Sequence, residues 1–193
     1  MAAVSGGAPV RLTSPDDTEG LAGTWSPDGA WFAYWHTAAR TLSLARVRTT
    51  GQTAPEILVR NVEPENSVPV WSPTGEWILY DNNGWRLRSP ETTAERDLAL
   101  KADVCTFSRD ATQLYCVRRA GQGSVLFSRL LAGGSERAIT RLASHQAPNS
   151  LLQPSLKMTL TPDGQHVTFS ARQTESNLWL LSGIDSRPAR QVP

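Results

Sequence analysis

The segment Trp25-Ser-Pro-Asp-Gly-Ala-Trp-Phe-Ala-Tyr34 decides the fold, because versions of it occur four times along the chain. Each version begins with an aromatic residue or Leu, continues through Ser or Thr into a turn, and ends in an apolar run. The other three copies are Trp71-Ser-Pro-Thr-Gly-Glu-Trp-Ile-Leu-Tyr80, Phe107-Ser-Arg-Asp-Ala-Thr-Gln-Leu-Tyr-Cys116 and Leu160-Thr-Pro-Asp-Gly-Gln-His-Val-Thr-Phe169. A repeat of this kind indicates a chain built from copies of one supersecondary unit.

Each copy predicts a tight hairpin followed by a buried strand. Pro sets φ near about −65°, Asp bonds to the neighbouring backbone, and Gly accepts a positive φ. The third copy has Arg109 and Ala111 in place of Pro and Gly, so we expect its turn to be the loosest. The runs Trp31–Trp35 and Trp77–Tyr80 are apolar throughout, which is typical of strands covered on both faces.

The repeat predicts an all-β fold, a partial or open β-propeller of four blades with four antiparallel strands each. A spacing of about 40 to 45 residues per unit is typical of such blades. Third strands are expected at 41–45, 85–87, 124–127 and 177–181, and more polar fourth strands at 56–59, 96–100 and 136–140; residues 91–101 could instead form a short helix, and residues 141–155 are expected to form a loop. We predict one domain over 1–193, with blades at about 21–60, 67–100, 103–140 and 155–192.

The hairpin segments resemble the TolB-like propeller repeat, also called the PD40 or WD40-like repeat, whose hallmark is Trp/Phe-Ser-Pro-Asp-Gly. The stretch Gly6-Gly-Ala-Pro-Val-Arg-Leu-Thr13 is similar to the strand that ends a blade in that family. Residues 8–13 are therefore expected to be the last strand of a preceding or closing blade. The segment Thr174–Ile184 is similar to the closing blade of propellers appended to bacterial serine/threonine kinases and winged-helix regulators.

Catalytic signals are weak in this sequence. There is no Gly-x-Ser-x-Gly elbow, and no motif places a nucleophile beside any of the three histidines. The spacings typical of zinc ligands are absent, and Gly121-Gln-Gly fits a hairpin turn better than a phosphate loop. The recurring Asp28, Asp110 and Asp163 are explained by turn capping. We therefore expect no enzyme activity, no metal and no cofactor.

Cys105 and Cys116 are expected to face each other across the third hairpin. If Phe107 pairs with Leu114, the same register places the two cysteines opposite one another. The favoured interpretation is two buried thiols that act as small apolar side chains. The alternative is a cross-strand disulfide, which requires an oxidising compartment.

Binding is expected on one loop face, because blade packing occupies the strands of a propeller. The connections on that face are acidic in the first half of the chain and basic in the second, and they include Asp81, Asn82 and Asn83. The best binding candidates are Arg118, Arg119, His145 and Arg172. The favoured function is an interaction or sensor module for a protein, peptide or small ligand. The alternative is the non-catalytic propeller of a larger enzyme, a prolyl-oligopeptidase-like hydrolase or a serine/threonine kinase.

The remaining expectations concern partners and location. Nineteen Lys and Arg against 18 Asp and Glu give a net charge of +1, which argues against nucleic-acid binding. No apolar run approaches the roughly 20 residues that span a bilayer, and the first residues do not form a signal peptide. We expect a cytoplasmic protein, or an extracytoplasmic one if a longer chain carries it. An open arc of four blades should self-associate through bare blade faces, with two copies forming an eight-blade ring as the less favoured arrangement.

Overall fold

The computed structural model describes residues 11–13, 23–51, 54–64, 67–121, 123–142, 158–161 and 165–169. The regular structure in these ranges consists of β-strands without a helix. The strands are β1 (Gly23–Trp25), β2 (Trp31–Ala38), β3 (Thr41–Arg48), β4 (Glu56–Val59), β5 (Val70–Trp71), β6 (Ile78–Asp81), β7 (Trp85–Arg88), β8 (Glu95–Leu100), β9 (Val104–Phe107), β10 (Gln113–Ala120), β11 (Gly123–Leu130), β12 (Arg137–Leu142), β13 (Met158–Leu160) and β14 (Val167–Phe169).

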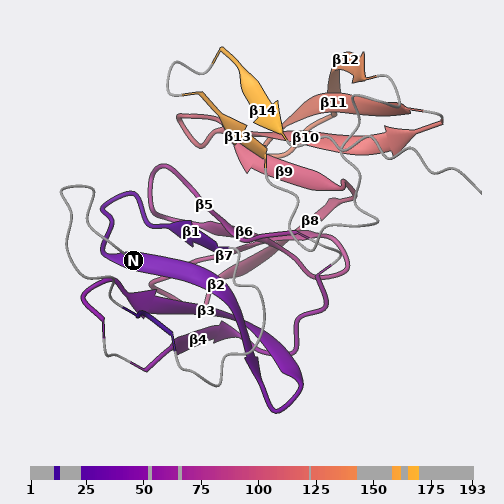
Figure 1. Ribbon diagram of the computed structural model, residues 1–193. Coiled ribbons are helices and arrows are strands. Elements are labelled where there is room, and N and C mark those ends of the chain that lie inside the picture. The colour runs from indigo at the N-terminus through magenta and orange to yellow at the C-terminus, as the bar shows by residue number, and fades with distance from the viewer. Residues whose placement is uncertain are drawn as a thin grey trace, which may run out of the picture.

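The strands form successive antiparallel sheets, and each sheet uses strands in chain order. The first blade is β1-β2-β3-β4, the second is β5-β6-β7-β8, and the third is β9-β10-β11-β12. The described part of the fourth blade is the pair β13-β14. Figure 1 shows the sheets following one another from the purple first blade to the orange and yellow strands of the last. The all-β partial propeller that the repeat predicts is confirmed.

Most of the apolar core lies between neighbouring blades. Ala33 and Trp35 of β2 cluster with Ile78 and Tyr80 of β6, while Tyr34 faces away from the second blade and packs with Ala45 and Val47. Alternate residues of β2 thus enter two different clusters. This confirms the expectation that the inner strands are covered on both faces. The outer strand β12 is mostly exposed, as expected for a blade edge.

One tryptophan of the first blade and one of the second each bond to the backbone that leads into the next blade. The indole Nε1–H of Trp35 donates to the carbonyl of Ser67 at 2.8 Å, just before the second blade. The indole of Trp85 donates in the same way to the carbonyl of Ala102 at 2.9 Å, just before the third. Each indole therefore fills an apolar junction and satisfies a backbone carbonyl there.

A side-chain hydroxyl builds all four hairpins. The hydroxyls of Ser26, Ser72, Ser108 and Thr161 accept the backbone N–H five residues later at 2.9, 3.1, 3.1 and 3.0 Å. The main chains of the same residue pairs also bond to each other at 2.8 to 2.9 Å. The expectation that the third turn is the loosest is wrong, because this bonding does not need Pro or Gly. Ala111 instead adopts φ 55° in the place of Gly29.

Two further interpretations are settled by the strands. Residues 95–100 form the strand β8, so the helical alternative for 91–101 is wrong. Arg141 and Leu142 belong to β12, so the expectation of a loop at these two residues is wrong. The rest of that expected loop, 143–155, and the expected strand at 177–181 lie outside the described residues.

Candidate functional site

Three segments lie side by side: the connection between the first and second blades, the turn between β6 and β7, and the connection between the second and third blades. We call the surface that they form, from Glu63 through 82–84 to 101–103, the loop face. Side chains and backbone link neighbouring connections there, since Asn82 Oδ1 accepts the N–H of Glu63 at 3.0 Å. Lys101 Nζ donates to the carbonyl of Asn83 at 2.7 Å. The connections of the first, second and third blades are thereby joined into one surface.

Arg118 and Arg119 lie on the strand β10, not in a loop as the sequence suggested. They stand opposite Val125 and Ser124 of β11, because the β10–β11 hairpin continues to Ala120 before it turns. In the second blade the equivalent strand β6 ends at Asp81, so its hairpin is much shorter. The longer hairpin of the third blade places the two arginines beside the end of the shorter second-blade hairpin. The other two candidates, His145 and Arg172, lie outside the described residues.

A hollow of about 260 Å³ lies between the second and third blades on this face. We call it the loop-face groove. The sequence candidates Arg118 and Arg119 come together there, along with Asp81, which the sequence placed on the same face. The complete lining is Asp81, Gly84, Lys101, Ala102, Asp103, Arg118 and Arg119. Side chains of both charge signs thus converge on one small volume.

Asp103 is the acidic group most affected by this environment. Burial raises the pKa of its carboxyl group, whereas the charge and the backbone N–H of Arg119 act in the opposite direction. Its Oδ2 atom is buried and has no hydrogen-bond partner within the part of the chain that the structure describes. An unpaired buried acceptor is costly, so this oxygen is suited to receive a donor from a bound molecule.

Arg118 is held by two contacts within its own blade. Its Nη1 atom lies 2.6 Å from Glu136 Oε2, and its guanidinium lies 4.5 Å from the ring centre of Phe127. Both partners belong to the third blade, and Arg118 remains partly exposed. The pair with Glu136 also lowers the net positive charge of this side of the groove.

A larger hollow of about 480 Å³ lies where the innermost strands of all four blades meet. Thr24, Val70, Cys105 and Met158 contribute to its wall from β1, β5, β9 and β13. Trp71 N–H and Thr24 Oγ1 approach to 3.4 Å across the first junction here. This hollow is the central channel of the propeller, and its wall is more apolar than that of the loop-face groove.

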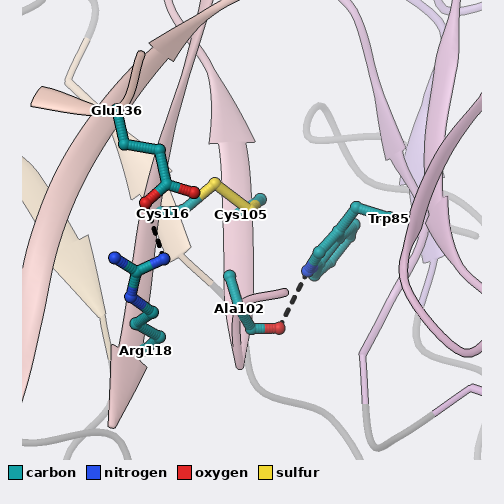
Figure 2. The surroundings of a disulfide bond; sticks show 6 residues. All are labelled: Trp85, Ala102, Cys105, Cys116, Arg118 and Glu136. Atoms are coloured by element: carbon teal, nitrogen blue, oxygen red, sulfur yellow. Dashed lines mark hydrogen bonds and ion pairs between the residues drawn. A yellow bond between two sulfur atoms is a disulfide. The ribbon is translucent and has the colours of Figure 1, made fainter. Parts of the chain in front are cut away.

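Cys105 and Cys116 are joined in a disulfide next to the channel. The predicted register is confirmed, since Cys105 pairs with Cys116 and Phe107 with Leu114. The favoured interpretation of two free thiols is wrong, because the two Sγ atoms are bonded at 2.03 Å. The physical reason is the close approach of facing residues across antiparallel strands, here a Cα–Cα distance of 4.2 Å. In Figure 2 the disulfide is seen with the Arg118–Glu136 ion pair on its left and the Trp85–Ala102 hydrogen bond on its right.

The described residues offer neither a metal-binding cluster nor a membrane-spanning helix. No group of three or more His, Cys, Asp or Glu side chains is placed there to hold a metal ion. Those same ranges contain no helix with the length and apolar character needed to cross a bilayer.

Sequence reasoning did not single out Lys101 or Asp103. Both precede a strand in an ordinary connection, and only the packing of the third blade against the second brings them to the arginines.

Comparison with solved structures identifies the fold as that of the TolB-like β-propellers. TolB from Acinetobacter baumannii aligns with a TM-score of 0.61 and 14% identity over 79% of this chain. The TolB-named protein from Agrobacterium tumefaciens aligns with a TM-score of 0.57 and 16% identity over 80%. A chain of the nidogen/laminin complex aligns with a TM-score of 0.57 and 13% identity over 78%.

The alignments cover only part of those longer chains. This chain spans 38% of the first, 60% of the second and 56% of the third. No protein-family model matches the sequence, and no curated protein matches it either. The similarity therefore establishes the propeller fold.

Proposed function

We propose that this protein is a binding module that recognises a segment of a partner protein in the loop-face groove. The observation that carries the proposal is the buried, unpaired Oδ2 of Asp103 in a hollow lined by side chains of both charge signs. Asp103 would accept a hydrogen bond from an amino or guanidino group of the partner. Lys101 and the two arginines would favour a carboxylate next to that group.

The geometry of the groove suits a polypeptide segment. Its floor comes from the short second-blade hairpin, and one wall comes from the longer β10–β11 hairpin. A volume of about 260 Å³ takes one or two side chains rather than a folded domain. We therefore propose that the groove binds its partner without catalysing a reaction.

The disulfide bears on where this binding would take place. Disulfides persist in oxidising compartments and are rare in the cytosol. The Cys105–Cys116 bond therefore favours the extracytoplasmic alternative over a cytoplasmic location.

The test is selection of peptides from a displayed random library on the purified wild-type chain. Binding of the selected peptides is then measured by titration calorimetry against Asp103→Asn and Arg119→Gln. Matched controls are Glu76→Gln and Arg137→Gln, which make the same chemical changes at exposed positions outside the groove.

We expect Asp103→Asn and Arg119→Gln to weaken binding at least tenfold, while the two controls leave it unchanged. Thermal melting of each variant verifies that the fold is retained. Selected peptides that bind all four variants as tightly as the wild type would contradict the proposal, and so would a library that yields no specific binder.

A further inference from the structure

The junction between the second and third blades is hollowed at both of its ends. The loop-face groove lies where β10 ends, at Arg118 and Arg119, and a second hollow of about 220 Å³ lies where β10 begins, at Leu114. We call this second hollow the basic groove. It is formed by β8, the start of β10, the end of β11 and the turn after β11. Its complete lining is Arg96, Asp97, Leu98, Leu114, Arg129, Leu130, Leu131, Ala132 and Gly133.

The first junction shows how an arginine at the equivalent position is used when the junction is closed. Ile78 and Leu114 hold the same place in the repeat, and they pair across their strands with Arg88 and Arg129. Arg88 is only 9% exposed, and its Nε atom donates to the carbonyl of Leu58 in the first blade at 3.1 Å. Its Nη1 atom donates to carbonyls of the β7–β8 turn in its own blade. The Arg88 guanidinium is therefore satisfied within the protein.

Arg129 has no such partners in the second junction. Its side chain is partly buried, and its guanidinium makes no ion pair or hydrogen bond with the residues that the structure describes. The contact across this junction comes from the other side, because Arg96 Nη2 donates to the carbonyl of Leu131. Two guanidinium groups, one from each blade, therefore face the same hollow.

The acidic side chain in the lining is engaged elsewhere. Asp97 Oδ2 lies 2.9 Å from Arg86 Nη2, and Asp97 Oδ1 accepts the N–H of Ala99 at 2.7 Å. Both carboxylate oxygens are thus held by the second blade, and the positive charge of the basic groove is not balanced by Asp97. The flat guanidinium group, with its parallel N–H donors, is matched to a carboxylate.

Apolar side chains accompany the two arginines. Leu98 and Leu114 are buried in the wall of the groove, whereas Leu130 is 54% exposed beside Arg129. A carboxylate alone would leave Leu130 exposed to water, and an apolar side chain next to that carboxylate would cover it. A volume of about 220 Å³ takes one or two side chains. The chemistry that fits is therefore Asp or Glu beside an apolar residue.

We propose that the basic groove is a second binding surface, which takes an acidic segment of a partner polypeptide with an apolar residue next to its carboxylate. The carboxylate pairs with Arg129 and Arg96, and the apolar residue packs on Leu130. Charge complementarity selects this occupant. The loop-face groove has side chains of both signs and an unpaired carboxylate oxygen, so the two ends of the junction select different segments. This proposal does not depend on the proposed function of the loop-face groove.

The test is selection from a displayed random peptide library on the Asp103→Asn chain, in which the loop-face groove is altered. Binding of the selected peptides is measured by titration calorimetry to the wild type, Arg129→Gln and Leu130→Ser. Matched controls are Arg137→Gln and Ile139→Ser on β12, because both positions are exposed and lie outside the lining of the basic groove. Thermal melting verifies that each variant retains its fold.

We expect selected peptides in which Asp or Glu stands next to Leu, Ile or Phe. Arg129→Gln and Leu130→Ser should each weaken their binding at least tenfold, while the two controls bind as the wild type does. Changing the acidic residue of the peptide to its amide should cause a similar loss. The proposal is overturned if no selected peptide depends on Arg129, or if the amide peptides bind as tightly as the acidic ones. Neither result would affect peptides that depend on Asp103, so the two proposals can fail separately.

Discussion

The first and third hairpins carry out the same turn with different residues. The first uses Ser26-Pro-Asp-Gly29, and the third uses Ser108-Arg-Asp-Ala111. In both, the Ser hydroxyl donates to the carboxylate two residues on, at 2.5 and 2.6 Å. In both, the amide N–H of residue 29 or 111 donates to the Ser carbonyl at 2.9 Å.

The difference lies in how each hairpin is restrained. The first relies on Pro27 and on a Gly29 with φ 71°, whereas the third accepts φ 55° at Ala111 and has the Cys105–Cys116 bond across its strands. The Ser–Asp pair is therefore sufficient to define the turn. Pro and Gly make the turn easier to form, and a covalent link across the strands can compensate for their absence.

Among the changes that test this comparison, breaking the disulfide should lower the free energy of unfolding the most. The two cysteines are 11 positions apart in the sequence, so their bond closes a short loop that restricts the unfolded chain, and a loop of similar size contributes about 3 kcal/mol. Reductant should lower the wild-type free energy of unfolding, measured by urea denaturation, by about that amount. The Cys105→Ala, Cys116→Ala double variant should not respond to reductant. An unchanged midpoint in a protein whose thiols are fully alkylated would refute this role.

Removing the Ser hydroxyl should have the next largest effect. Ser26→Ala and Ser108→Ala each leave a backbone N–H without its acceptor, at a cost of about 1 to 2 kcal/mol. Urea denaturation compares them with Ser135→Ala, which changes an exposed serine. Equal stability of all three variants would show that the hydroxyls do not hold the turns.

Exchanging glycine and alanine at the positive-φ position of the turn measures how much backbone strain there costs in stability. A Cβ on Gly29 would meet nothing within 4 Å, so Gly29→Ala tests conformation alone and should cost about 1 kcal/mol. Ala111→Gly relieves strain but loosens the unfolded chain, so we expect a change within about 0.5 kcal/mol. The two variants are compared by thermal and urea unfolding. A Gly29→Ala protein as stable as the wild type would remove the reason for glycine in the repeat.

Acidification should destabilise the first and third hairpins more than the second. This effect should be smaller than those of the preceding substitutions. The Ser hydroxyl, followed by backbone N–H groups, lowers the pKa of Asp28 and of Asp110. A lowered folded-state pKa gives stability that is present above the unfolded value of about 3.9 and is lost as pH falls through the folded value. The second hairpin has Thr74 at this position, which does not titrate.

The measurement is the urea midpoint at about pH 5 and about pH 3, across the range in which these aspartates titrate. Asp28→Asn and Asp110→Asn keep an acceptor oxygen without a titrating proton. Each should lose less stability on acidification than the wild type. If the wild type and both variants respond identically, the turn aspartates do not contribute to acid sensitivity.

The repeat was sufficient to predict the strand order of the first three blades and the pairing of the two cysteines, because both depend on short-range register. Once Phe107 is set opposite Leu114, Cys105 must face Cys116. The oxidation state does not follow from register, and there the preferred interpretation differed from the structure. The role of the Ser hydroxyl was also missed, since Pro, Asp and Gly appeared to explain the turn by themselves.

The candidate site was harder to predict because it lies between blades. Arg118 and Arg119 were found from the charge of their segment, but their place on β10 depends on how far that hairpin extends. Asp103 and Lys101 reach the same groove only through packing of the third blade on the second. A pattern within one repeat does not contain the contacts between two repeats.

The indole of Trp85 gives this site a built-in spectroscopic reporter. Its Nε1–H is bonded to the carbonyl of Ala102, and Ala102 is part of the groove wall between Lys101 and Asp103. A segment that enters the groove must alter the electrostatic field at that carbonyl, and indole emission is sensitive to such a field. Trp35 makes the equivalent bond to the carbonyl of Ser67 at the other junction. Occupancy of the groove could thus be followed by fluorescence without any attached label.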